Sequence, residues 1–232
     1  MHKKLVIFDL DGTLLNTIAD IAYAANVVLE RHHFPTHTID AYRQMVGNGI
    51  RKLMERAIPE AERTEMFVSQ MRDEFADVYQ HHCMVDTVIY PGIVELLTSL
   101  QQCNIAVAVA SNKFHDATVS IIAHYFPEIQ FLAVVGHRDG KPTKPAPDIV
   151  FDIIGGRFLL EEVLYVGDSG VDMLTAHNAG VDSVGVTWGF RTREELREYG
   201  AKHLVDKPSE TLNFCCPVTL NNTSFGCKTK QY

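Results

Sequence analysis

Short runs of apolar, β-prone residues alternate along the chain with stretches of helical periodicity. The apolar runs lie at residues 5–8, 105–110, 131–135, 163–166 and 183–187. They are apolar nearly throughout, which is typical of strands buried on both faces of a parallel sheet. Between them, Ile93, Leu97 and Leu100 fall on one helical face, and Ile149, Val150 and Ile153 begin another such stripe. Because right-handed crossovers place helices on both faces of such a sheet, the pattern predicts an α/β fold with a doubly wound parallel sheet.

The interval between the first two runs is far longer than one crossover needs. Helical stretches fall there at 18–29, 39–46, 50–57 and 62–82, with breaks at Gly47-Asn48-Gly49 and Pro59. We predict that residues 16–85 form an inserted α-helical cap, hinged near 14–17 and 86–92, and that residues 1–15 and 86–208 form the core. The alternative is that these helices pack on the face of the sheet.

The last part of the chain has a different character. Residues 209–232 lose all periodicity and are rich in Cys, Asn and Thr. Terminal segments of this kind are often held to a domain by few contacts. We therefore expect an irregular C-terminal tail.

Composition narrows the class of protein. The chain has 232 residues, of which 46% are hydrophobic and 22% charged, enough for a large core. A formal net charge of −8 disfavours a nucleic-acid partner. No apolar run approaches the length of a membrane span. The first residues run into an acidic strand end rather than a signal peptide. The five cysteines lack zinc-ligand spacing. We expect a cytoplasmic protein with reduced thiols and no membrane partner, either monomeric or weakly dimeric.

Two acids stand where the first apolar run ends. Asp9 and Asp11 follow residues 5–8 and precede Gly12 and Thr13. Like charges repel and neither adds to a core, so acids placed in this way are usually held by a counter-ion or used as chemical groups. The pair predicts a divalent-metal site with a carboxylate nucleophile. The plainer alternative is an acidic turn with a helix-capping Asp and a turn glycine.

Polar groups also follow the later strands. Ser111 and Asn112 follow the second run, Lys144 lies in the loop after the third, and Asp168 follows the fourth. In a doubly wound sheet, functional groups gather at the carboxyl ends of the strands. We therefore predict that these groups and Asp9 face one crevice.

These motifs, in this order and at these strand ends, resemble those of the haloacid dehalogenase superfamily of phosphatases. Within it, the chain is similar to the phosphoglycolate-phosphatase-like group with a helical cap. The resemblance covers about residues 3–208, and Gly47-Asn48-Gly49 and Tyr90-Pro91-Gly92 add to it. It implies Mg²⁺-dependent hydrolysis of a small organic phosphomonoester, phosphoglycolate-like, through an aspartyl-phosphate intermediate.

The resemblance implies a role for each acid of the first and last motifs. Asp9 would be the nucleophile, because a carboxylate is ionised at neutral pH and its acyl phosphate can be hydrolysed. Asp11 would be the general acid–base. Mg²⁺ would bind Asp9, the Asp11 carbonyl and Asp168, which with water and a phosphate oxygen suit its preference for oxygen ligands.

The resemblance also implies a phosphoryl-binding set. Ser111, backbone groups near Asn112, and Lys144 would contact the transferring phosphoryl group. Lys141 also precedes a proline, but only Lys144 matches the family's Lys-Pro-x-Pro pattern. Asp172 is either a support for the metal site or an acid at a helix N-terminus that the helix dipole stabilises, and the two are compatible.

The cap must discriminate among leaving groups, because the core motifs handle only the phosphoryl group. Asn48 and Arg51 are the candidate specificity residues, since a Gly-rich loop lets the backbone approach a ligand closely. The plainer alternative is that the two glycines merely separate two helices.

Other functions stay open at this point. A sugar-phosphate mutase of the β-phosphoglucomutase type and a pyrophosphatase would share the core motifs. A phospho-Asp signalling module would also phosphorylate an Asp on a doubly wound sheet. The large insertion and the Asp-x-Asp-Gly-Thr spacing argue against such a module.

Overall fold

The core of the protein is a six-stranded sheet in which all neighbouring strands are parallel. In the computed structural model, which describes residues 2–215, the strand order is β5-β4-β1-β6-β7-β8. The strands are β1 (Leu5–Phe8), β4 (Ala106–Phe114), β5 (Phe131–His137), β6 (Val163–Gly167), β7 (Asp182–Val186) and β8 (His203–Val205). The chain extends the sheet from β1 first in one direction and then in the other, so the predicted doubly wound fold is confirmed.

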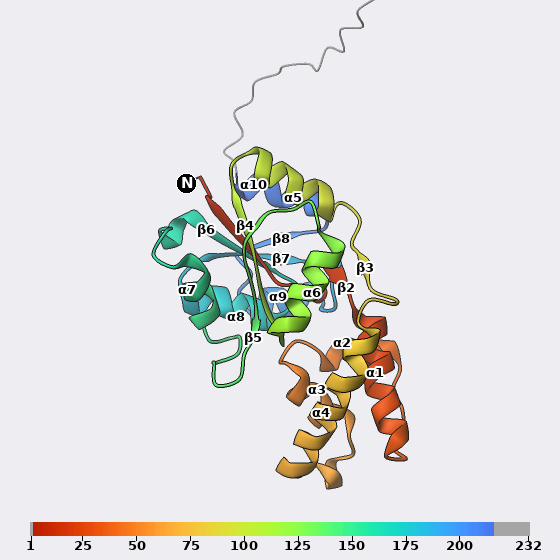
Figure 1. The fold of residues 1–232 in the computed structure, drawn as a ribbon. Helices are drawn as coiled ribbons and strands as arrows, with labels where there is room; N and C mark the ends of the chain where they lie inside the picture. Colours follow the sequence, from red (N-terminus) through yellow and green to blue (C-terminus); the bar gives the residue numbers. More distant parts are fainter. Residues whose placement is uncertain (1, 216–232) are drawn as a thin grey trace, which may run out of the picture.

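Helices cover both faces of this sheet (Figure 1). Val6 and Phe8 of β1 belong to the apolar cluster that contains α5 (Ile93–Gln102) and α6 (His115–Tyr125). Leu5 and Ile7 belong to the opposite cluster, with α7 (Asp148–Ile154) and α8 (Gly170–Ala179). All four β1 side chains are fully buried, because successive residues of a strand point to opposite faces. The apolar character of the strand therefore reflects two covered faces.

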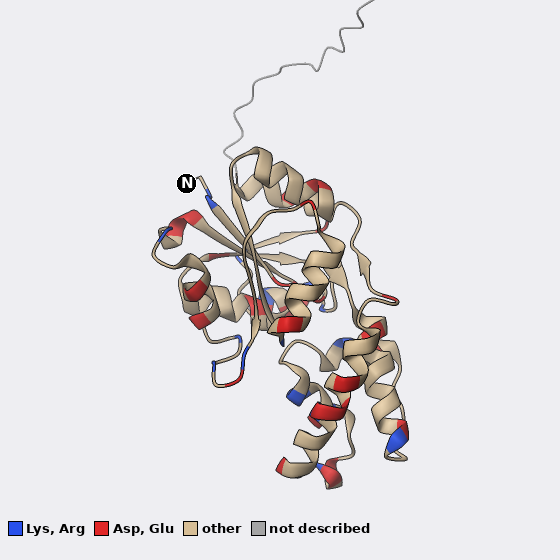
Figure 2. Ribbon diagram, viewed as in Figure 1, with Lys and Arg blue, Asp and Glu red and all other residues tan. Residues whose placement is uncertain are grey.

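Four helices form a bundle beside the sheet rather than lying flat on it (Figure 1). They are α1 (Ile18–Arg31), α2 (Ile39–Met45), α3 (Ile50–Ala57) and α4 (Glu65–His82), with a 3-10 turn at Glu60–Glu62. Acidic and basic residues are interspersed along the ribbon of this bundle (Figure 2). Its apolar interior, including Tyr42 and Phe75, is continuous with the cluster on one face of the sheet. The exact domain boundaries proposed above stay a prediction.

The chain passes between sheet and bundle through two very short strands. β2 (Leu15–Asn16) pairs antiparallel with β3 (Val88–Ile89), close to both predicted hinges. The buried Asp20 of α1 accepts hydrogen bonds from the backbone N–H groups of Val85, Asp86 and Thr87 at 2.9–3.2 Å. A buried carboxylate requires such donors, so Asp20 ties the returning segment to the start of the bundle.

The end of the described chain differs from the expected irregular tail. A 3-10 turn at Pro208–Thr211 leads into α10 (Leu212–Cys215), which lies beside α5 (Figure 1). Thr211 and Cys215 are buried, and the Cys215 carbonyl accepts a hydrogen bond from Lys3 N at 3.2 Å. Residues 209–215 thus form short helical turns docked on the core instead of an irregular segment. Residues 216–232 lie outside the described residues.

Two smaller helical elements complete the described part of the chain: α9 (Arg193–Glu198) and a 3-10 turn at Leu160–Glu162. Within residues 2–215, every helix is too short or too polar to span a bilayer.

Candidate active site

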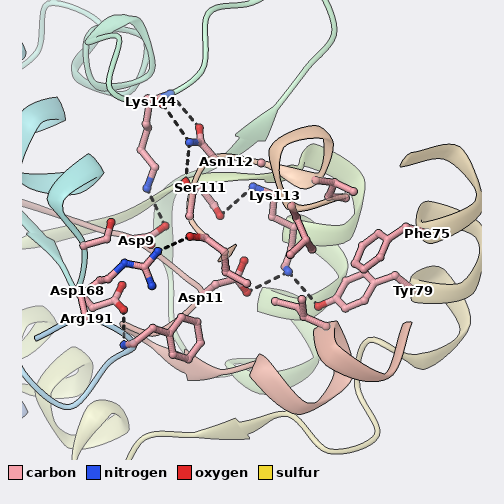
Figure 3. Close-up of a pocket in the computed structure, with 18 residues that line it drawn as sticks. Asp9, Asp11, Phe75, Tyr79, Ser111, Asn112, Lys113, Lys144, Asp168 and Arg191 are labelled. Carbon is pink, nitrogen blue, oxygen red and sulfur yellow. Dashed lines mark hydrogen bonds and ion pairs between the residues drawn. The ribbon is translucent and has the colours of Figure 1, made fainter. Parts of the chain in front are cut away.

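The strand-end residues singled out in the sequence line one pocket (Figure 3). Asp9 and Asp168 follow the central strands β1 and β6, Ser111 and Asn112 lie near the end of β4, and Lys144 comes from the loop before α7. The pocket holds about 630 Å³ of empty space that opens to solvent. Its opposite wall comes from the helix bundle, through side chains and backbone of residues 46–53 and of α4. The predicted common crevice is thus present, and the bundle covers it.

Three carboxylates cluster at the bottom of this pocket, two in its lining and the third, Asp172, buried beneath it. Asp9, Asp168 and Asp172 offer oxygens that lie within 4.8 Å of one another. The residues are only 8%, 2% and 0% exposed. Burial, followed by the charge of Asp172, raises the pKa of Asp9 well above its usual range, although Lys144 opposes this shift. Burial and the charge of Asp172 also raise the pKa of Asp168 to about 7. In the protein alone, Asp9 and Asp168 therefore hold a proton more readily than exposed acids do.

Lys144 is the cation inside this cluster. Its Nζ donates to Asp9 Oδ1 at 2.8 Å, Asp172 Oδ1 at 2.7 Å and the Ala110 carbonyl at 3.0 Å. Burial alone would lower the pKa of Lys144, but the charges of Asp172 and Asp9 raise it above its usual range, so the ammonium is retained. Lys141 instead faces solvent, 3.8 Å from Asp152 Oδ2. The structure thus places Lys144, and not Lys141, beside Asp9.

Asp172 has two sets of contacts, which correspond to both readings of this residue. Its Oδ1 receives the Lys144 ammonium, and its Oδ2 accepts hydrogen bonds from Ser169 N at 3.1 Å and Ser169 Oγ at 2.6 Å. Ser169 is the N-cap of α8, so these bonds also close the first turn of that helix. Asp172 therefore fixes the position of Lys144 from the base of α8.

The residues present fit a hard divalent cation such as Mg²⁺. The available donors are carboxylate oxygens, and Asp168 is oriented by the Phe190 N–H at 2.7 Å and by Thr13 Oγ at 3.3 Å. Gly12 has φ +91°, and a Cβ there would lie 2.2 Å from Asp168 Oδ2. A glycine is therefore required for the turn that carries Asp11 to approach Asp168 so closely.

A second buried lysine, which the sequence reasoning missed, joins Asp11 to the bundle. Lys113 Nζ lies 3.0 Å from Asp11 Oδ1 and donates to the Tyr79 hydroxyl of α4 at 2.9 Å (Figure 3). Thr17 Oγ also donates to Asp11 Oδ1, at 2.7 Å. Burial would lower the pKa of Lys113, but Asp11 and Tyr79 raise it above its usual value, so the ammonium stays charged. The only signal in the sequence was its place directly after Ser111-Asn112.

Asn112 acts as a clamp between two loops. Its Oδ1 accepts from Lys144 N at 2.9 Å, and its Nδ2 donates to the carbonyls of Lys144 at 3.1 Å and Gly47 at 3.0 Å. The side-chain amide is therefore engaged with backbone groups. Ser111 is buried on the pocket wall, where its Oγ accepts from Lys113 N at 3.2 Å.

The two candidate specificity residues of the cap contact other protein groups, and their role stays a prediction. Asn48 Oδ1 accepts from Arg56 Nη2 at 2.8 Å, and Arg51 forms an exposed ion pair with Glu65. Neither residue lines the pocket, which the backbone at Gly47 and Gly49 reaches instead. Helix α3 begins at Ile50, and because successive helix residues are about 100° apart, Ile50 and Leu53 face the pocket while Arg51 turns away.

Comparison with known proteins decides the family. A family model described as haloacid dehalogenase-like hydrolase matches residues 6–186, most of the chain. The chain belongs to this family. Haloacid dehalogenase-like hydrolases are enzymes, so the predicted family and the predicted enzyme class are both confirmed by the match and by the relatives that follow.

Several relatives of the haloacid dehalogenase-like chain are named phosphoglycolate phosphatase. The protein from Colwellia psychrerythraea is 30% identical over 217 residues, covering 91% of this chain and 96% of the relative. That from Vibrio vulnificus is 31% identical over 217 residues, covering 90% and 95%. A solved structure from Lactobacillus delbrueckii subsp. bulgaricus has a TM-score of 0.88 at 30% identity, covering 94% of this chain and 100% of that chain.

Proposed function

We propose that this haloacid dehalogenase-like hydrolase is a Mg²⁺-dependent phosphatase for small organic phosphomonoesters, with phosphoglycolate as its preferred substrate. The observation that carries the proposal is the contact between Lys144 and Asp9 inside a buried cluster of three carboxylates at the pocket floor. Lys144 opposes the rise in the pKa of Asp9 and holds its carboxyl group toward a site where an anionic group must bind. The name shared by the relatives supports the choice of phosphoglycolate.

In the first half of the reaction, Asp9 attacks phosphorus. An Oδ of Asp9 forms a bond to phosphorus while the bond between phosphorus and the ester oxygen breaks, which produces an aspartyl-phosphate and an alcohol. The carboxylic acid of Asp11 gives its proton to the departing oxygen. Lys144 offsets the charge of the phosphoryl oxygens and of Asp9 during the transfer.

In the second half, water releases the phosphate. The carboxylate of Asp11 takes a proton from water as the water oxygen attacks phosphorus, and the bond between phosphorus and Asp9 breaks. Asp9 and the protonated Asp11 are then ready for another substrate. Asp11 lies on the cap side of Asp9 and contacts Lys113 and Tyr79, which is the side where a leaving group would extend.

The proposed Mg²⁺ would be held by Asp9, Asp168 and the Asp11 carbonyl. When bound, it supplies positive charge that reduces the repulsion between an anionic nucleophile and an anionic ester. Hydrogen bonds from other residues orient these ligands. The Phe190 N–H and the Thr13 hydroxyl hold Asp168, and Lys144 holds Asp9. A preoriented ligand set lowers the cost of assembling the site.

Phosphate release from a panel of esters tests the proposal. The panel comprises phosphoglycolate, hexose phosphates, nucleotides and pyrophosphate, each with and without Mg²⁺, and Asp9→Asn is the inactive control. We expect the highest kcat/KM for phosphoglycolate. Isomerisation of a hexose phosphate without phosphate release would identify a mutase, and preference for pyrophosphate a pyrophosphatase. A long-lived phosphoprotein without turnover would identify a signalling module.

A further inference from the structure

Arg191 reaches the pocket from the segment between β7 and α9 (Figure 3). Its side chain is only 9% exposed. Nη2 donates to the carbonyls of Val46 at 2.7 Å and Gln44 at 3.2 Å, both in the bundle, and Nε lies 3.3 Å from Glu195 Oε1. One guanidinium of the core thus holds the cap segment that covers the pocket.

The third nitrogen of this guanidinium, Nη1, makes no hydrogen bond within the described part of the protein. Arg191 Nη1 is buried and has no hydrogen-bond partner among residues 2–215. A buried donor of a charged group that is left unpaired costs free energy, so such donors are rare unless a ligand completes them. Because Arg191 lines the pocket, the molecule that occupies the pocket is the available partner.

The other two cations that line the pocket, Lys113 and Lys144, are paired with acidic groups of the protein. Lys144 is surrounded by Asp9, Asp172 and a carbonyl, and Lys113 is held by Asp11 and Tyr79. Among the described cations that line the pocket, Arg191 is the one with a buried nitrogen that has no hydrogen-bond partner. It also stands at the boundary between the core, which handles the phosphoryl group, and the cap, where the leaving group must lie.

We propose that Arg191 binds the carboxylate of the leaving group and so selects phosphorylated hydroxy acids over esters of neutral alcohols. This inference rests on the proposed function and adds the residue that recognises the carboxylate of the substrate. Guanidinium and carboxylate are complementary in charge and in planar shape. With Nη2 on the cap segment and Nη1 on the substrate, a bound carboxylate also favours the covered form of the pocket.

The inference is tested with two esters that differ only in charge. Phosphoglycolamide replaces the carboxylate of phosphoglycolate by a neutral amide of the same size. We expect Arg191→Met to lower kcat/KM for phosphoglycolate about ten- to hundred-fold more than kcat/KM for phosphoglycolamide, the loss typical of a hydrogen bond to a charged group, because the loss of the contacts with the cap segment affects both esters. Arg191→Lys should lose part of the preference, because an ammonium lacks the fork geometry.

Arg193→Met is the matched control, since Arg193 is an arginine nearby that pairs with Asp206 and does not line the pocket. It should leave both substrates unaffected. Equal losses on both esters in Arg191→Met would overturn the inference and reduce Arg191 to a clamp on the cap. A selective loss in Lys113→Met, with Arg191→Met unchanged, would also overturn it and move the carboxylate site to Lys113.

A binding measurement separates specificity from turnover and from folding. In 3-phosphonopropionate, a CH2 group replaces the ester oxygen of phosphoglycolate, so the molecule cannot be hydrolysed there. By calorimetry, the wild-type protein should bind it more tightly than its amide, and Arg191→Lys should narrow that difference even if Arg191→Met does not fold. A wild-type protein that turns over phosphoglycolate no better than phosphoglycolamide would refute the proposed substrate. A wild-type preference that survives in both variants would refute only the role of Arg191.

Discussion

The ammonium nitrogen of Lys113 lies 3.0 Å from Oδ1 of Asp11, and both side chains are largely buried at the pocket wall. Asp11 is the proposed acid–base of the reaction. The same ammonium donates to Tyr79 of the bundle, so a single cation connects the reacting centre to the element that covers it. Burial strengthens this interaction, because a charge removed from water depends on its few remaining partners.

Removing Lys113 should impair the step that needs an acid. In Lys113→Met, Asp11 loses the contact that positions its carboxyl group for proton transfer. We expect kcat for phosphoglycolate, whose alcohol leaves only when protonated, to fall at least about tenfold. The fall for an aryl phosphate with a good leaving group should be much smaller.

The leaving-group comparison also provides the control for Lys113→Met. Lys141→Met alters an exposed lysine that does not line the pocket and should leave both rates unchanged. A loss in Lys113→Met that is equal for the two esters would show that Lys113 serves folding or phosphoryl binding and not Asp11.

Substituting the exposed cap residues should not change the order of substrate preference. Arg51 pairs with Glu65 at the surface, and Asn48 contacts Arg56. We expect Arg51→Ala and Asn48→Ala to keep KM for phosphoglycolate within about threefold, because exposed ion pairs contribute little. Steady-state kinetics with the panel of esters checks this, and a selective rise of KM in either variant would return the specificity role to that residue.

Binding of Mg²⁺ should tighten as pH rises through 7. Burial raises the pKa of Asp168 to about 7, so below that pH the metal-free carboxyl keeps a proton that the cation must displace. An acid whose pKa is raised on folding stabilises the native state below its unfolded pKa, and this contribution is lost as pH rises through the folded pKa. For Asp168 the loss falls between about pH 4 and pH 7.

Thermal unfolding with and without Mg²⁺ measures this coupling. The rise in Tm on adding Mg²⁺ should be small at about pH 6 and larger at about pH 8. Asp168→Asn should be stabilised little by Mg²⁺ at either pH, because it lacks both the titrating group and the ligand. A rise in Tm that is the same at both pH values in the wild-type protein would contradict the assignment of Asp168.

Much of the core was predictable because a strand that is buried on both faces is apolar along its whole length. The strand at Leu5–Phe8 is apolar throughout, and the acids that follow it are conspicuous for that reason. The edge strand β8 and the paired β2 and β3 have only two or three residues each, too few for any periodicity to show. Their pairing depends on tertiary contacts that no local pattern reports.

The strand-end rule found the residues at the pocket floor but not those at its upper wall. Asp9, Lys144 and Asp168 meet because the carboxyl ends of parallel strands share one edge. Tyr79 and Arg191 reach the pocket through the packing of the bundle on the core, which the sequence does not specify. In the cap, the backbone of the glycine-rich segment faces the pocket, while the side chains of Asn48 and Arg51 contact other protein groups.

Phosphorylation of Asp9 is the central claim. Asp9→Asn should abolish turnover, by several orders of magnitude, and keep the fold, because it removes the nucleophile with little change of shape. Its thermal unfolding in the absence of Mg²⁺ should be no less cooperative than that of the wild type. Residual activity above about one per cent of the wild-type rate would remove Asp9 from this role.

The most direct measurement is the chemical trapping of the phosphoenzyme. In Asp11→Asn, an aryl phosphate with a good leaving group can still transfer its phosphoryl group, whereas water lacks the base that activates it. Rapid acid quench and mass spectrometry of the peptide that contains Asp9 should find the phosphoryl group on Asp9, and Asp9→Asn should show none. Full turnover of this ester by Asp11→Asn without any phosphorylated Asp9, or phosphate on another residue, would contradict the account.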